Sequence, residues 1–278
     1  MSRSESPGTD PASLAASAVK PAVRTETAPR PAAPRPERSV EYGEVRAGIE
    51  LRYELKLVSD EAAYPELRMA LRLDRAGIRT LYPERIVQTL YLDTTYGKLL
   101  EENLGGLSAR EKLRLRWYGP SSERVHSSLE RKCRENSLGW KEIAPVAGEL
   151  ELAGRERRPF MLDLLSRLDA RWQARLAGYE PAQWVRYRRQ YLTTADRRVR
   201  LTLDRELFFS DQRRMGRLSD SEPTPSPRVL VIELKCSPED HDVARDLVSR
   251  LPLPIGRCSK FVLAAERSSG PLPSQLEV

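Results

Sequence analysis

The sequence predicts an α+β fold: an antiparallel β-barrel tunnel with a charged interior, flanked by a few helices. Two observations support this fold class. Five segments alternate charged with apolar residues at the period of two that a β-strand imposes. Only two or three amphipathic helical stretches lie between the strands, without the regular strand–helix alternation of a parallel α/β protein.

The strand Lys112–Gly119 is the most informative of the five. One of its faces carries Lys112, Arg114 and Arg116, and the other carries Leu113, Leu115 and Trp117. A solvated strand tolerates three like charges in a row at modest cost. A buried strand with the same charges needs a polyanion to balance them.

The other four strands each place two charged residues on one face. These pairs are Glu54 with Lys56, Glu130 with Lys132, Arg198 with Arg200, and Glu233 with Lys235. For any one strand, the charged face is explained equally well as the solvent face of a half-buried sheet. A closed sheet with all these faces turned inward would explain the five strands together.

The remaining elements follow from local signals. Helical spacing covers Glu61–Leu73, and Pro83 is expected to break the chain. Further strands are expected at Ile86–Leu92, Ser108–Tyr118, Ser128–Arg134 and Val229–Lys235, with a turn at 93–97, a loop at 136–137 and a return segment at Trp140–Glu142.

Two helices, a hairpin and a last short segment are predicted in the C-terminal half. Pro159–Leu176 is predicted to be one amphipathic helix, with the apolar stripe Met161, Leu164, Leu165, Leu168 and Trp172 facing the core. Trp184–Thr193 and Arg197–Phe209 are predicted to form a hairpin, and Pro238–Leu251 a helix. A last short segment is expected around 258–262.

Composition sets the domain organisation. Residues 1–40 hold seven of the 21 prolines and eight alanines, which predicts a disordered tail. Residues 41–267 are expected to form the folded tunnel domain and residues 268–278 a flexible tail. No apolar run approaches the ~18 residues of a membrane span, and the N-terminus lacks a secretory h-region.

Charge and cysteine usage narrow the function. The net charge of +7 and the pI near 9.4 indicate an anionic partner. Aromatic residues are only 6% of the chain, and inward-facing glutamates would repel a phosphodiester backbone, so no nucleic-acid partner is expected. Three dispersed cysteines without a CxxC motif predict reduced thiols in the cytoplasm and no zinc site.

The chain has no glycine-rich phosphate loop, so side chains would have to hold any phosphate groups. A polyphosphate chain would match a lining of Lys56, Arg114, Arg116, Lys132, Arg189 and Arg200. Glu54, Glu130 and Glu233 are candidate hard-oxygen ligands for Mg²⁺ or Mn²⁺. Cross-strand ion pairs explain each glutamate as well.

Seven motifs in order carry a family resemblance: Tyr53–Lys56, Tyr91–Thr94, Leu113–Gly119, Leu129–Lys132, Arg198–Asp204, Glu233–Lys235 and Ser259–Phe261. With these motifs the chain resembles the polyphosphate polymerase domain of the vacuolar transporter chaperone complex. That domain belongs to the triphosphate tunnel metalloenzyme superfamily and is related to CYTH domains. The resemblance covers roughly residues 42–267.

The resemblance implies transfer of the ATP γ-phosphate to a growing polyphosphate chain, assisted by a divalent metal, often manganese. Carried over by motif, the catalytic lining is Lys56, Arg114, Arg116, Lys132, Arg189, Arg200 and Lys260. Lys141, Lys235 and Arg257 join as substrate-binding residues, Arg257 standing where the family has a lysine. Glu233 matches the metal-binding glutamate, with Glu54 and Glu130 as second choices.

Three functions stay open at this point. The first is a polymerase using ATP with a polyphosphate or pyrophosphate acceptor. The second is a tunnel hydrolase of inorganic or nucleoside triphosphates, and the third is a non-catalytic polyphosphate-binding module. The sequence shows no sensor domain and no transmembrane bundle of the eukaryotic assemblies. It is therefore interpreted as a stand-alone bacterial domain, with room for a separate membrane partner at the inner face of the membrane.

Overall fold

The computed structural model describes residues 53–135, 138–221 and 228–268, all within one compact unit of the chain. Its strands are β1 (Tyr53–Asp60), β2 (Arg79–Thr94), β3 (Ala109–Tyr118), β4 (Arg124–Val125), β5 (Ser128–Glu135), β6 (Leu138–Pro145), β7 (Leu150–Glu151), β8 (Tyr179–Thr193), β9 (Val199–Asp211) and β10 (Val229–Cys236). Its α-helices are α1 (Tyr64–Leu73), α2 (Lys98–Leu104), α3 (Arg157–Ser166), α4 (Ala170–Leu176), α5 (His241–Ser249) and α6 (Lys260–Ser268). Short 3₁₀ turns precede α1 and α5, at Glu61–Ala63 and Pro238–Asp240.

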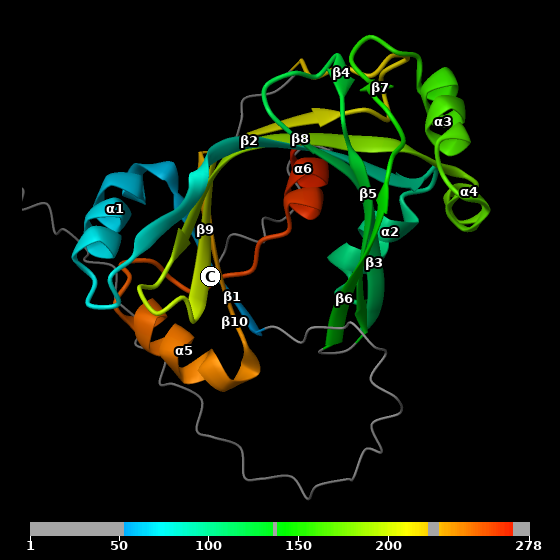
Figure 1. The fold of residues 1–278 in the computed structure, drawn as a ribbon. Coiled ribbons are helices and arrows are strands. Elements are labelled where there is room, and N and C mark those ends of the chain that lie inside the picture. Colours follow the sequence, from blue (N-terminus) through cyan, green and yellow to red (C-terminus); the bar gives the residue numbers. More distant parts are fainter. Residues whose placement is uncertain (1–52, 136–137, 222–227, 269–278) are drawn as a thin grey trace, which may run out of the picture. The chain divides into compact units, whose positions relative to one another are not determined.

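Eight strands form one antiparallel sheet in the order β1-β10-β9-β8-β2-β3-β5-β6, and β4 pairs with β7 separately. The sheet curls into a half-barrel whose two ends face each other across its concave side (Figure 1). The predicted α+β class with a curled antiparallel sheet is confirmed. The outer edge of β1 is partly covered by the segment 254–256, where the Gly256 amide donates to the Lys56 carbonyl at 3.0 Å.

Alternation along the strands separates the two faces of the sheet. On the convex face of β1, β10 and β9, buried leucines pack against α1 and α5. On the convex face around β3 and β5, Leu115 and Leu129 pack in one cluster with Phe160 of α3 and Trp172 of α4. The concave face carries the charged residues, so the expected inward orientation of the charges is confirmed.

Helix α6 departs from the expectation that the helices lie outside the sheet. It lies on the concave side, beneath β8 and β2 (Figure 1). The Phe261 ring stacks on Tyr91 of β2 with 4.7 Å between ring centroids. Because the apolar residues of α6 fill that end of the half-barrel, the charged side chains are confined to the rest of the concave face.

Two local predictions were wrong for identifiable reasons. Pro83 does not break the chain: it lies inside β2, at a register shift between Tyr82 and Arg85 that a β-bulge accommodates. The single helix predicted for residues 159–176 is two helices, because the Asp169 carboxylate caps a new one by accepting from the Trp172 amide at 2.9 Å. Helix α2 was not predicted.

The origin of α2 lies in the turn that the sequence did identify. The Asp93 side chain is 2% exposed and accepts from the backbone amides of Thr94, Leu99 and Leu100 at 2.7, 2.8 and 3.0 Å. These bonds satisfy amides at the start of α2 that have no partner within the helix. The predicted tail at residues 1–40, the loop at 136–137 and the C-terminal tail beyond residue 268 lie outside the described residues.

We expect Asp93→Ala to lower the free energy of unfolding by about 1–3 kcal/mol, because three amides lose their acceptor. Urea denaturation followed by circular dichroism measures this change. Asp242→Ala is the matched control, since that side chain is 98% exposed in the first turn of α5. An equal effect of the two substitutions would contradict the role assigned to Asp93.

Candidate functional site

Strand register brings charged side chains from seven strands onto the concave face. Directly paired residues share a face of the sheet, and the pairs Lys56–Glu233, Arg114–Glu130 and Lys132–Lys141 all lie on this one. We define the cationic face by ten cations and four carboxylates: Lys56, Lys112, Arg114, Arg116, Lys132, Lys141, Arg189, Arg200, Lys235, Lys260, Glu54, Glu130, Asp204 and Glu233.

Glu130 of β5 organises one group on this face. Its carboxylate accepts from Arg114 Nε at 2.8 Å and lies 3.7 Å from Arg116 and 3.3 Å from Lys141. Burial alone would raise the pKa of Glu130, but Arg114 and Arg116 outweigh it and lower the pKa to about 2. Glu130 is therefore ionised and already occupied by protein cations.

Asp204 of β9 organises a second group. It is fully buried and accepts hydrogen bonds from Nε and Nη2 of Arg189, each at 2.6 Å. The Lys260 ammonium also lies 2.6 Å from this carboxylate. Arg189 and Lys260 also lie over the ring of Tyr187, 5.2 and 4.8 Å from its centroid, and Arg116 donates to the Tyr187 hydroxyl at 3.2 Å. Burial raises the pKa of Tyr187, but the neighbouring arginines outweigh it and the pKa is lowered.

Glu54 and Glu233 form a third group with three lysines. Lys56 lies 3.1 Å from Glu54 and 3.6 Å from Glu233, and Lys235 lies 3.1 Å from Glu233. Lys132 reaches Glu54 at 3.8 Å. That contact joins β5 to β1 although five other strands separate them in the sheet, so side chains close the half-barrel where the backbone does not.

Lys112 has a different environment from the other lysines. Its ammonium donates to Ser259 Oγ at 2.7 Å, beside the N-terminus of α6. Burial, followed by the charges of Lys56 and Lys132, lowers the pKa of Lys112 to about 7. The described chain thus gives this amine a hydroxyl partner and no carboxylate.

Twelve of the thirteen residues predicted from the sequence lie on the cationic face. Arg200 is exposed at its margin, opposite Lys235 in the sheet. Arg257 is the exception: its side chain is exposed and lies near Arg110. Burial, followed by the charges of Arg134 and Arg257, lowers the pKa of Arg110.

The three predicted metal-ligating glutamates do not form one cluster. Glu130 lies with the arginines, apart from Glu54 and Glu233. Within residues 53–135, 138–221 and 228–268, no group of three or more His, Cys, Asp or Glu side chains could hold a metal ion. A metal ion at this face would therefore complete its coordination with oxygens of a substrate or of water.

Sequence reasoning placed Lys112 on the charged face of its strand without listing it as a site residue, and it missed Tyr187 and Asp204. Asp204 could have been found, because it is four residues from Arg200 in the predicted strand and therefore lies on the same face. The structure also distinguishes Arg189 from the adjacent Arg188 by their ion-pair partners. Arg188 pairs with Glu206 and Glu84, whereas Arg189 turns to Asp204.

Several buried polar atoms on the concave face have no hydrogen-bond partner within the described chain. They are Thr89 Oγ1, Arg116 Nε and Thr202 Oγ1. Thr89 lies directly opposite Arg116, and Thr202 lies opposite Glu233. Because buried polar groups are normally hydrogen-bonded, these atoms mark positions where a ligand oxygen or water would be bound.

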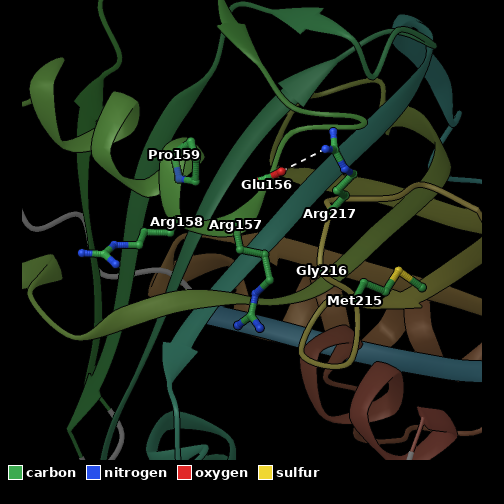
Figure 2. A pocket seen from close by; sticks show the side chains of 7 residues that line it. All are labelled: Glu156, Arg157, Arg158, Pro159, Met215, Gly216 and Arg217. Carbon is green, nitrogen blue, oxygen red and sulfur yellow. Dashed lines mark hydrogen bonds and ion pairs between the residues drawn. The ribbon is translucent and has the colours of Figure 1, made fainter.

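An open pocket of about 410 Å³ lies away from this face, at the start of α3 (Figure 2). Its charges are largely paired: Arg217 bonds Glu156 at 2.9 Å, and Arg157 bonds Glu180. It lacks the excess of buried cations found on the cationic face. We therefore assign the functional site to the cationic face.

Comparison with known proteins gives one family. The VTC domain model matches residues 51–268. Among solved structures, a candidate adenylate cyclase from Vibrio parahaemolyticus is 16% identical, with a TM-score of 0.43 and coverage of 77% of this chain and 98% of that chain. The Schizosaccharomyces pombe Mediator head module is 11% identical, with a TM-score of 0.39 and coverage of 73% and 96%. Both scores are low, so neither likeness carries weight.

No curated protein matches the chain. Within the part of the chain that the structure describes, no helix has the length and apolar character needed to cross a membrane.

We expect binding of a polyanion at pH 8 to take up protons, because the Lys112 amine is then largely neutral and an adjacent phosphate favours its ammonium form. Affinity for inorganic tripolyphosphate should accordingly fall as the pH rises above about 7. Calorimetric titration in two buffers of different ionisation enthalpy gives the number of protons taken up.

Lys112→Met should reduce this uptake by up to about one proton. Lys98→Met, at an exposed position on α2, is the control and should leave it unchanged. The assignment fails if wild type and Lys112→Met take up the same number of protons.

Proposed function

The chain belongs to the VTC domain family, and on that basis we propose that it is a polyphosphate polymerase that uses ATP. The observation that carries the proposal is the cationic face, where ten lysines and arginines meet only four carboxylates. Such an excess on a partly buried surface is stabilised when an extended polyanion binds. A triphosphate and a polyphosphate chain both have this shape and charge.

In the proposed reaction, an oxygen of the terminal phosphate of the acceptor attacks the γ-phosphorus of ATP. A new P–O bond forms, the bond from the γ-phosphorus to the β–γ bridging oxygen breaks, and ADP leaves with that electron pair. No side-chain nucleophile is required. The protein aligns two polyanions and neutralises the charge on the transferring phosphoryl group.

The three groups on the face have separate roles in this proposal. Arg114 and Arg116 offer guanidinium donors to phosphate oxygens, and Arg116 Nε is free to make one more hydrogen bond. Arg189 and Lys260 are held in place by Asp204, so they are positioned before substrate binds. Lys112 and Lys132 extend the positive charge toward the acceptor.

Glu233 and Glu54 are the residues that would hold a divalent metal. Both carboxylates are ionised. Burial raises the pKa of each, but the charges of the surrounding lysines outweigh burial, so both pKa values are lowered. Two carboxylates suit Mg²⁺ or Mn²⁺, which are commonly bound through one or two carboxylates together with substrate phosphates. Such an ion would supply charge neutralisation at the phosphate oxygens.

The free thiols of the cysteines agree with a cytoplasmic location for an enzyme that uses ATP as donor. Cys133, Cys236 and Cys258 are all unpaired, as expected in a reducing compartment. Export of the product would then fall to a separate membrane partner.

The direct test is to incubate the purified protein with ATP and Mn²⁺, with and without pyrophosphate, and to follow ADP, free phosphate and gel-resolved polyphosphate. A polyphosphate ladder with matching ADP is expected. Free phosphate without a ladder would identify a triphosphate hydrolase instead. Binding without turnover would identify a polyphosphate-binding module.

We expect Arg114→Ala and Arg116→Ala each to weaken tripolyphosphate binding by about 1.5–3 kcal/mol, because each loses a charge-assisted contact. Calorimetry measures the dissociation constants. Arg171→Ala is the control, since Arg171 is 67% exposed and lies off the cationic face. Unchanged affinity in both site variants would show that these arginines do not contact phosphate.

Glu233→Gln should lower metal-dependent turnover by about 100-fold or more, because the amide replaces an anionic oxygen ligand. The circular dichroism spectrum should match wild type. Glu156→Gln, an exposed glutamate beside α3, serves as the control. Normal turnover of Glu233→Gln across a Mn²⁺ titration would overturn the metal assignment.

A further inference from the structure

Three side chains form an aromatic rim at one end of the cationic face: Tyr82, Arg85 and Tyr118. The tyrosines are 52% and 54% exposed. The guanidinium carbon of Arg85 lies 6.0 Å from the centre of the Tyr82 ring and 5.8 Å from that of Tyr118. One cation thus lies over both rings, and about half of each tyrosine stays exposed to a ligand.

The rim continues the rows of residues that hold phosphate in the proposed function. On β3, Tyr118 follows Arg114 and Arg116 on the same face, at steps of about 7 Å. On β2, Arg85 lies directly opposite Arg189 of β8. Two neighbouring strand pairs therefore lead from the buried arginines out to the rim.

The bulge at Pro83 makes this arrangement possible. Tyr82 and Arg85 are three residues apart, yet they pair with Tyr191 and Arg189, which are two apart on one face of β8. The extra residue turns both side chains to the concave side. Tyr191 packs against Tyr82 in an edge-to-face contact, with 5.9 Å between ring centroids.

We propose that the aromatic rim binds the nucleobase of the nucleotide whose triphosphate lies on the cationic face. The inference rests on the proposed use of a nucleoside triphosphate. Tyrosine rings and an arginine plane both stack on the flat face of a base. Inorganic phosphate chains have no ring and gain nothing from these residues, so the rim would distinguish the donor from the acceptor.

The rim also fixes the direction in which the nucleotide lies. With the base at the Tyr118 end of β3, the triphosphate runs along Arg116 and Arg114. The γ-phosphate then points toward Lys112 and Lys132. The acceptor chain approaches from that opposite end, which lacks the two exposed rings.

The test compares ATP with inorganic tripolyphosphate by calorimetry, for wild type and for the double variant Tyr82→Ala/Tyr118→Ala. We expect ATP to bind about tenfold more weakly to the variant, a loss of about 1.4 kcal/mol. Tripolyphosphate should bind equally to both proteins. Tyr82→Phe/Tyr118→Phe keeps the rings and should retain ATP affinity.

Tyr96→Ala is the matched control, because Tyr96 is 91% exposed in the turn after the other end of β2. The proposal is overturned if ATP affinity is unchanged in the alanine variant, if both ligands weaken together, or if wild type does not bind ATP. Failure of the polymerase proposal has a different signature. Polyphosphate would not form, while ATP and tripolyphosphate would still respond differently to loss of the rings.

Discussion

The buried carboxylate of Asp204 is the interaction on which the site depends. It joins Arg189 of β8 and Lys260 of α6 to β9 with three contacts of 2.6 Å. Removing one partner from such a group leaves a buried charge uncompensated, which is strongly destabilising. The same contacts hold the start of α6 within the half-barrel, beside Lys112 and Lys56. Fold and site therefore rest on the same pairing.

Much of this arrangement could be predicted from the sequence, because strand alternation is a local property. The alternating faces of β3 and the charge pairs on β1, β5 and β10 need only a period of two. The position of α6 could not be predicted that way, since a helix with an apolar stripe can pack on either side of a sheet. Asp204 was missed for a related reason: its partner on α6 is remote in sequence. The bulge at Pro83 could not be predicted locally, because a proline donates no ladder hydrogen bond and the bulge that accommodates it is defined by pairing with the remote strand β8.

The four carboxylates explain how so many cations can share one surface before a ligand arrives. Glu130 offsets the arginines of β3, Asp204 offsets Arg189 and Lys260, and Glu233 offsets the lysines of β1 and β10. Lys112 is left with only a hydroxyl, and its pKa is lowered by burial and then by the neighbouring positive charges. The aromatic rim adds a feature that phosphate binding alone does not require.

The assignment of the site requires that the cationic face carries positive charge that a bound polyphosphate neutralises. The most direct measurement is the melting temperature with and without inorganic tripolyphosphate, against potassium chloride at equal ionic strength. We expect the melting temperature to rise by about 5 °C or more at saturating tripolyphosphate, because the ligand binds only the folded protein. Potassium chloride should give little change. No rise, or an equal rise with both salts, would contradict the claim.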